Sequence, residues 1–591
     1  MSTIFGSFEA AKSGLSTSLL QRNVTEQNIA NANTKGYTRQ RAITSAKEPN
    51  SSNYLIAPRH SALVGQGVEV TKVTQIRSQY LDAQYRKLSS DYFAGDAVDE
   101  AMTYLCGVLN ELDEDAGLTV AIKNFYSALN TFTSDPSSRE YRTNVQQQAQ
   151  ALTDTFNTIY NEMMSLWEDQ NASIKTDVEQ INAYAEKIAN LNLAIARATQ
   201  AEAATNDLKD ELNLLLDELS EYVDIEFEFK ANDTVDVYVG GHLLVSGRYF
   251  NKLNVTSKAS EVDAITAQIA QLNRRIMAAP EGEKEAIALE RSALIEKLAD
   301  YGFTVQEETG GEEGAVSLKL PNGRYLVNGT QSFSSAQAMS DLLPMDQWVA
   351  FSQNTVSIDV AAGDGTEPLD FGGAVKGGRL YGHMRMAGSL DKDLQGIPFY
   401  MNELNELARA IAQDINDIHQ QGYTYPYDGK ESRSGINFFH VASRQDEGGN
   451  TIYDYSTLTA GNLRLSDEVK ESPFNIAASD KPIDLSAGST ESGNNLNARR
   501  LFETLSQNGY YDRLNSIVAD LAIETDTVQN IKTTKNTLLI SVDTQRQSLS
   551  SVSMDEETTN LIMFQQTYNA CARVVTTISE MIDTLINRMG V

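Results

Sequence analysis

The C-terminal segment of this chain repeats its apolar residues at alternating steps of three and four. This spacing predicts a helix with one continuous apolar face. Such a face is stable in water only when another surface covers it, so the helix needs a partner. The predicted seam consists of Leu561, Phe564, Tyr568, Cys571, Val575, Ile578, Ile582, Leu585 and Met589.

The best candidate for that partner lies at the other end of the chain, where residues 4–32 have a shorter and less regular apolar stripe. Each segment covers about 28 residues and would form a helix of roughly 42 Å. Residues 1–50 carry six Lys and Arg against three Glu, whereas residues 555–591 carry five acids against two Arg, which weakly favours pairing. The predicted partner face consists of Ile4, Phe8, Ala11, Leu15, Leu19 and Ile29.

A heptad-like stripe is more often an ordinary core face than an assembly surface. Its position favours assembly here, because core helices seldom occupy both ends of a chain this long. The sequence also predicts where the last helix begins, because Ser553 and Glu556 have the spacing of a reciprocal capping box.

Composition limits the class of protein. The chain has 591 residues, enough for three or four domains, and a formal net charge of −32, which argues against nucleic acid as a partner. Its two cysteines, Cys106 and Cys571, are too few for a disulfide framework. We expect no membrane insertion and no cleaved signal peptide, because the sequence has neither a run of about 20 apolar residues nor a basic segment before an apolar one.

The periodicity changes along the chain from helical to alternating and back. Residues 290–329 resemble residues 211–247 at an offset of about 80, each with the pattern of a helix followed by a hairpin, which indicates either a duplication or two similar hairpins without common origin. We predict a mixed α and β protein, mostly α, built as a nested multi-domain rod. Its expected parts are a terminal coiled coil (1–45 with 545–591), a helical domain with irregular and β segments (46–222 with 376–544), and a β-rich outer domain (223–375) with a helical-hairpin insertion near 260–300.

Catalytic signatures are missing from the sequence. The five histidines form no H-E-x-x-H motif, there is no G-x-S-x-G elbow, and Gly429 and Lys430 lack the first glycine of a phosphate loop. Residues 113–117 begin like a calcium loop but lack its glycine and closing glutamate. We therefore predict a protein that is not an enzyme and has no cofactor or metal.

Both termini carry a family resemblance. The stretch 27–40, QNIANANTKGYTRQ, resembles the signature that closes the first helix in bacterial flagellar rod, hook and hook-associated proteins. Residues 553–587 resemble the members of this axial family at the hook-filament junction, as do scattered segments such as 377–380 and 419–423. The motif residues of the N-terminal signature are Asn28, Asn31, Thr34, Gly36 and Tyr37.

The resemblance implies a structural adaptor between hook and filament that is required for filament assembly. It also implies a ring of identical subunits in contact with the hook protein and with a second junction protein, hook-associated protein 3. Such proteins are exported through the flagellar type III channel to the extracellular flagellum, with a chaperone on the C-terminal helix. Two alternatives stay open: another axial protein of the hook or distal rod, and a surface binding module within residues 250–375.

Overall fold

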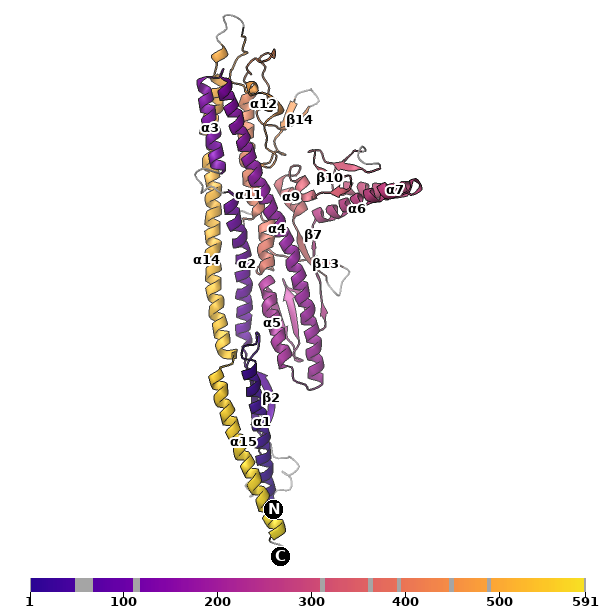
Figure 1. Ribbon diagram of the computed structural model, residues 1–591, viewed down its shortest axis with the longest axis vertical. Coiled ribbons are helices and arrows are strands. Elements are labelled where there is room, and N and C mark those ends of the chain that lie inside the picture. The colour runs from indigo at the N-terminus through magenta and orange to yellow at the C-terminus, as the bar shows by residue number, and fades with distance from the viewer. Residues whose placement is uncertain are drawn as a thin grey trace. The chain divides into compact units, whose positions relative to one another are not determined.

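A computed structural model of the chain describes residues 2–47, 67–109, 117–308, 314–359, 365–390, 395–445, 451–485 and 491–588. It is mostly helical with several small antiparallel sheets, which confirms the predicted fold class (Figure 1). The chain forms two compact units. The first unit consists of residues 1–92, 181–251 and 534–591, and the second unit consists of residues 93–180 and 252–533. The three predicted domains stay a prediction.

The first unit contains both ends of the chain. Its elements are α1 (Ser2–Ala30), β1 (Gln40–Ala46), β2 (Val68–Gln75), the start of α2 (Gln79–Leu109), the end of α4 (Arg139–Gln200), α5 (Asn206–Tyr222), β3 (Ile225–Phe229), β4 (Val235–Val239), β5 (His242–Ser246), β6 (Tyr249–Phe250), the end of α14 (Tyr510–Ser550), α15 (Met554–Asp583) and the π-helical η4 (Thr584–Arg588).

The second unit contains the rest of α2, α4 and α14 and a longer run of short elements. These are α3 (Leu118–Ser134), β7 (Leu253–Thr256), α6 (Lys258–Ala278), α7 (Glu281–Ala299), β8 (Gln306–Glu308), β9 (Ser317–Lys319), β10 (Tyr325–Asn328), β11 (Gln331–Ser332), α8 (Ser335–Met339), α9 (Met345–Ser352), β12 (Thr355–Asp359), β13 (Thr366–Pro368), α10 (Arg379–Gly388), α11 (Ile397–His419), β14 (Ala442–Gln445), β15 (Thr451–Asp454), α12 (Asp467–Glu471), η2 (Pro473–Asn475), η3 (Glu491–Gly493) and α13 (Leu496–Gln507).

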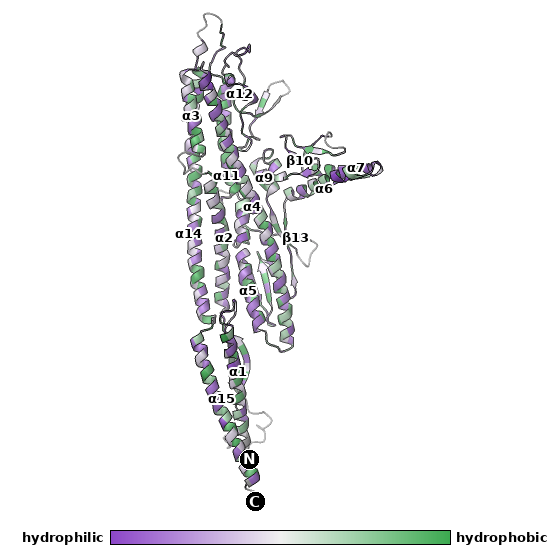
Figure 2. Ribbon diagram, viewed as in Figure 1, coloured by the Kyte–Doolittle hydropathy of each residue, from purple (hydrophilic) through white to green (hydrophobic). Residues whose placement is uncertain are grey.

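The core of the second unit follows the predicted periodicity. Along α11 the apolar residues recur at three and four and are buried, among them Leu404, Leu407 and Ile411. Trp167 of α4 packs against Trp348 of α9 with ring centroids 4.6 Å apart. Figure 2 shows hydrophobic residues alternating with polar ones along these helices.

Two parts of the chain share one local architecture. In each, a pair of helices precedes a four-stranded antiparallel meander: the end of α4 and α5 with β3 to β6, and α6 and α7 with β8 to β11. Turn glycines in the left-handed conformation, Gly247 and Gly329, end the third strand of each meander.

A buried asparagine joins helix to sheet in the same way in both copies. The side-chain amide of Asn192 donates to the carbonyl oxygens of Val235 and Gly247, and its oxygen accepts from the Val235 N–H. Asn273 makes the same three bonds to Val316 and Gly329.

Because these contacts repeat at the same spacing, the structure favours duplication over two unrelated hairpins. It also corrects the interpretation of residues 260–300. The helical hairpin is not an insertion between two copies but the first half of the second copy, since α6 carries the asparagine that fixes the second meander. The sequence comparison misses this because the matching helix in the first copy is the end of α4.

Candidate functional site: the paired termini

The N-terminal motif is organised around Asn28, which is buried near the end of α1. Its amide nitrogen donates to the Gln40 carbonyl (2.9 Å) and to Glu557 Oε2 on α15 (3.0 Å). Its oxygen accepts from the Gln40 N–H (3.0 Å) and from the Tyr37 hydroxyl (2.8 Å). Asn28 therefore ties α1 to the first strand and to the last long helix, 529 residues away in the sequence.

The other motif residues shape the turn after α1. The Thr34 N–H donates to the Asn31 carbonyl and the Thr34 hydroxyl to the Asn31 side chain. Gly36 has φ +84°, and a Cβ there would meet the Leu214 side chain of α5 at 3.3 Å. Burial and the nearby carboxylates of Asp210, Asp207 and Glu557 raise the pKa of Tyr37. The turn therefore delivers the Tyr37 hydroxyl, as a neutral donor, to Asn28.

Arg39 continues the connection between the termini. Its guanidinium pairs with Glu557 at 2.7 Å and with Glu556 at 2.8 Å, and its backbone N–H donates to the last residue of α14, Ser550. The hydrogen bond from Arg39 lowers the pKa of Glu556. The predicted capping box is present in one of its two hydrogen bonds. The Ser553 side chain accepts from the Glu556 N–H, but the Glu556 carboxylate binds Arg39 instead of the backbone N–H of Ser553.

The predicted C-terminal seam lies on one face of α15. Every described member from Leu561 to Ile582 is at least partly buried, and Ile578 is 7% exposed, whereas the residues between them are exposed except Ala572, which is partly buried. Leu585, in the π-helical η4, is half exposed, and Met589 lies outside the described residues. Cys571 faces Gly14 of α1 so closely that a Cβ on the glycine would meet its sulfur at 2.9 Å.

The predicted face of α1 needs correction. Ala11 is buried and Phe8, Leu15 and Ile29 are half-buried, but Leu19 is 36% exposed, and the side chain of Ile4 lies outside what the structure describes. The most buried positions are instead small or polar ones that appeared to interrupt the stripe. They are Thr17, Ser18, Thr25 and Asn28.

The reason for this pattern is that α1 is covered from two sides. It packs along α15 and also against β1 and β2, where Ser13 accepts from the Val68 N–H. Small side chains allow this close approach, so burial on α1 does not follow hydrophobicity. The packing of Gly14 on Cys571, like the bond from Asn28 to Glu557, shows that the two helices run antiparallel.

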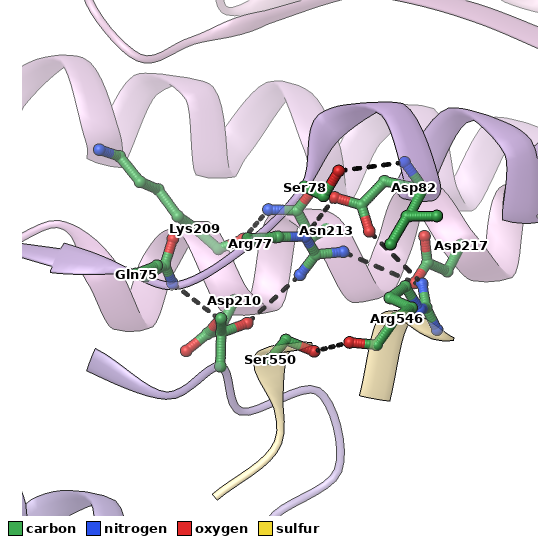
Figure 3. A network of polar contacts seen from close by, with 12 residues as sticks. Gln75, Arg77, Ser78, Asp82, Lys209, Asp210, Asn213, Asp217, Arg546 and Ser550 are labelled. Carbon is green, nitrogen blue, oxygen red and sulfur yellow. Dashed lines mark hydrogen bonds and ion pairs between the residues drawn. The ribbon is translucent and has the colours of Figure 1, made fainter. Parts of the chain in front are cut away.

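A network of buried charges lies beside the end of α14 (Figure 3). Asp217 of α5 is its centre: it binds Arg86 of α2 at 2.7 Å and Arg546 of α14 at 2.5 Å. Burial alone would raise the pKa of Asp217, but the guanidinium groups of Arg86, Arg546 and Arg77 lower it. The sequence analysis missed this network, since its members are far apart in the chain and none belongs to a known motif.

A groove of 890 Å³ opens where β1 and β2 meet the connection between α14 and α15. Its lining mixes apolar side chains such as Ile43, Met563 and Phe564 with the guanidinium groups of Arg39, Arg41 and Arg77. In the described part of the chain, no group of three or more His, Cys, Asp or Glu side chains could hold a metal ion. Nor does any described helix have the length and apolar character needed to cross a membrane. The contacts between the termini hold the helices of the first unit together.

The chain matches the family described as flagellar hook-associated protein FlgK helical domain over residues 102–260 and 254–439, more than half of its length. It belongs to the FlgK family. Residues 544–589 also match the C-terminal region of flagellar basal body rod proteins, described as FlgEFG. The paired termini described above include this second region.

Relatives of the FlgK family match the chain along its whole length. Flagellar hook-associated protein 1 of Bacillus subtilis is 27% identical over 100% of this chain and 99% of the relative. The proteins of the same name from Salmonella typhimurium and Escherichia coli are 24% and 25% identical, with 98% of each chain covered. The solved structure of the flagellar hook junction protein FlgK from Burkholderia pseudomallei has the same fold, with a TM-score of 0.50, 13% identity, and coverage of 80% of this chain and 100% of that one.

Family membership makes this FlgK-family chain a structural, hook-associated protein of the bacterial flagellum, where it assembles with other axial proteins. The family is one of flagellar structural proteins, not of enzymes. The resemblance in the terminal motifs is therefore confirmed at the level of the family.

Proposed function

We propose that this chain is the adaptor that joins hook to filament and is required for filament assembly. The observation that carries the proposal is the joined termini: Asn28 and Arg39 fasten the first helix to Glu557 of the last, so the two ends form one pair of helices. A relative in the FlgK family is named a hook junction protein, and the C-terminal half of this pair matches rod proteins. A protein that connects two axial assemblies of the flagellum needs a structural module in common with its neighbours, and the paired terminal helices are such a module.

The proposed partners follow from the same role. The chain forms a ring of identical subunits between the hook protein and hook-associated protein 3. It leaves the cell unfolded through the flagellar type III channel without a cleaved signal peptide. A chaperone covers the apolar seam of α15 until α1 is free to take its place, because a seam from Leu561 to Ile582 exposed in water invites aggregation.

The test compares flagella by electron microscopy in a strain that lacks this protein and in strains that carry variants. We expect naked hooks from the deletion and from removal of residues 555–591. A chain with Ile578→Glu should give the same result, because a charge would be buried between α15 and α1. Asn569→Glu, on an exposed position of the same helix, is the matched control and should restore filaments.

Loss of the hook itself in the deletion strain would favour the alternative, a hook or distal-rod component. Long attached filaments from the chain without residues 555–591 would refute the adaptor role.

A further inference from the structure

The two copies of the helix pair and meander can be compared position by position. Glu211 of α5 corresponds to Glu290 of α7, so the two helices align at an offset of 79 residues. One side of each helix is buried in both copies, and it is the side that each copy covers by itself. In α5 it consists of Leu212, Leu216 and Leu219, and in α7 of Arg291, Ile295 and Leu298.

The two helices differ along the next stripe, whose positions are three or four residues apart. In α5 this stripe is buried or partly buried and consists of Asp210, Asn213, Asp217 and Ser220. The matching residues of α7 are all exposed, and we call them the exposed stripe: Leu289, Ser292, Glu296 and Ala299. Leu289 is 75% exposed. Because the local architecture is the same in both copies, the difference lies in what else contacts each helix.

In the first copy, an arginine from another helix covers the stripe. Arg86 of α2 pairs with Asp217 at 2.7 Å and donates to the side-chain oxygen of Asn213 at 2.9 Å. Its guanidinium carbon also lies 4.4 Å from the centre of the Phe227 ring in β3. The stripe of α5 is therefore a binding surface for an arginine that a neighbouring helix presents.

The second copy keeps the carboxylate of this surface but not its cover. Glu296 stands where Asp217 stands in the first copy, and it is exposed. The strand register places Glu307 of β8 where Phe227 lies in β3, because each pairs with the same position of the next strand. The Glu307 carboxylate acts on the buried Arg291 guanidinium, where it opposes the lowering of the pKa by burial. Glu296 is thus the carboxylate that remains for a partner.

The exposed stripe also defines the kind of helix that fits it. Leu289 and Glu296 are seven residues apart, which is about 10.5 Å or two turns along α7. A helix lying alongside meets both if its own apolar side chain and its cation are also seven residues apart. Arginine suits this position better than lysine, because a planar guanidinium binds a carboxylate through two donors at once.

The rest of the chain narrows the source of such a helix. In the described part of the chain no helix covers the exposed stripe, since all four of its residues are exposed. A second copy of the chain cannot supply α2, because Arg86 is buried against its own α5.

We propose that the exposed stripe of α7 binds a helix of a different protein, which presents an arginine to Glu296 and an apolar side chain to Leu289. The inference goes beyond the adaptor role and does not depend on it. It gives the two copies different functions: the first uses the stripe to bind another part of its own chain, and the second uses it to recruit a partner.

The test uses the full chain in its own cells, with the photo-cross-linker benzoylphenylalanine in place of Ser292 at the centre of the exposed stripe. The matched site is Glu290, which lies on another side of α7 and is exposed in both copies. After irradiation we expect an adduct from the first site and none from the second. Mass spectrometry should assign the cross-linked peptide to a different protein, in a helix with an arginine and an apolar residue seven positions apart.

Charge reversal tests the role of the arginine. With the cross-linker at Ser292, Glu296→Arg should reduce the adduct at least about tenfold, and replacing the partner's arginine by glutamate should restore it. Glu290→Arg is the matched control and should leave the adduct at the wild-type level. Both purified variants should keep wild-type helical content and thermal stability, because both positions are exposed.

The absence of an adduct, or equal adducts from the two sites, would overturn the inference. So would an adduct that survives Glu296→Arg, or cross-linking to another copy of this chain.

Discussion

Replacing Asn28 by alanine should loosen the paired termini without disturbing the second unit. The change leaves the buried N–H and C=O of Gln40 without their partner in α1 and removes the direct bond from α1 to Glu557. An orphaned buried polar group costs about 1 to 3 kcal/mol, so the two backbone groups together predict a loss of about 2 to 6 kcal/mol in the unfolding free energy of the first unit.

The two tryptophans provide an internal control for this experiment. Trp167 and Trp348 pack together in the second unit, so their fluorescence reports on that unit alone, whereas circular dichroism reports on all helices. In a urea titration, Asn28→Ala should produce an early loss of helical signal while the fluorescence midpoint stays at the wild-type value.

Asn31→Ala is the matched variant for the same titration, because Asn31 belongs to the same motif but its side chain bonds, among the described residues, only to Gln27 at the end of α1 and to Thr34 in the turn. We expect it to shift the helical transition by less than about 1 kcal/mol. The reasoning is refuted if the two alanine variants unfold at the same urea concentration, or if Asn28→Ala moves the tryptophan transition.

Three further predictions concern single positions. Acid should destabilise the second unit through His419, because burial lowers the pKa of this side chain from 6.5 to about 4. Between these values the unfolded chain binds a proton that the folded chain does not, so the contribution of His419 to stability is complete above pH 6.5 and falls by about 2 kcal/mol at pH 5. Urea titrations monitored by tryptophan fluorescence should lack this component in His419→Gln. Gly36→Ala should destabilise the first unit more than Gly241→Ala does, as measured by thermal melting with circular dichroism. Both glycines have positive φ, but only at Gly36 would the added Cβ also meet another side chain, and equal effects would contradict this reasoning. Asn273→Ala should increase hydrogen exchange in β9 and β10 while β4 and β5 keep wild-type protection, and a change in both meanders would count against independent copies.

Periodicity in the sequence was sufficient to predict the helices and the seam of α15, because hydrophobic burial sets the spacing of apolar residues on a helix that is covered on one side. It failed on α1, which is covered on two sides and is most buried at Thr17, Ser18 and Thr25. Small and polar residues leave no apolar signal even where they are the closest point of contact.

Asn192 and Asn273 were missed for a related reason. Asn28, Asn192 and Asn273 each bond both the N–H and the C=O of one residue in a strand or directly before one, as a neighbouring strand would. A buried asparagine on a helix resembles a break in the apolar pattern, so sequence reasoning discards it. The motif around Asn28 was identified by family resemblance alone, and its partner Glu557 was counted only among the acids of residues 555–591.

The bond between Asn28 and Glu557 has a consequence for the order in which the chain can fold. It joins residues 529 positions apart. A contact this distant in the sequence forms only when both ends are available, and closing so long a loop carries an entropic cost that local helices do not bear. Whichever end emerges first must wait for the other, so the paired termini are the last part of the chain to reach their native structure.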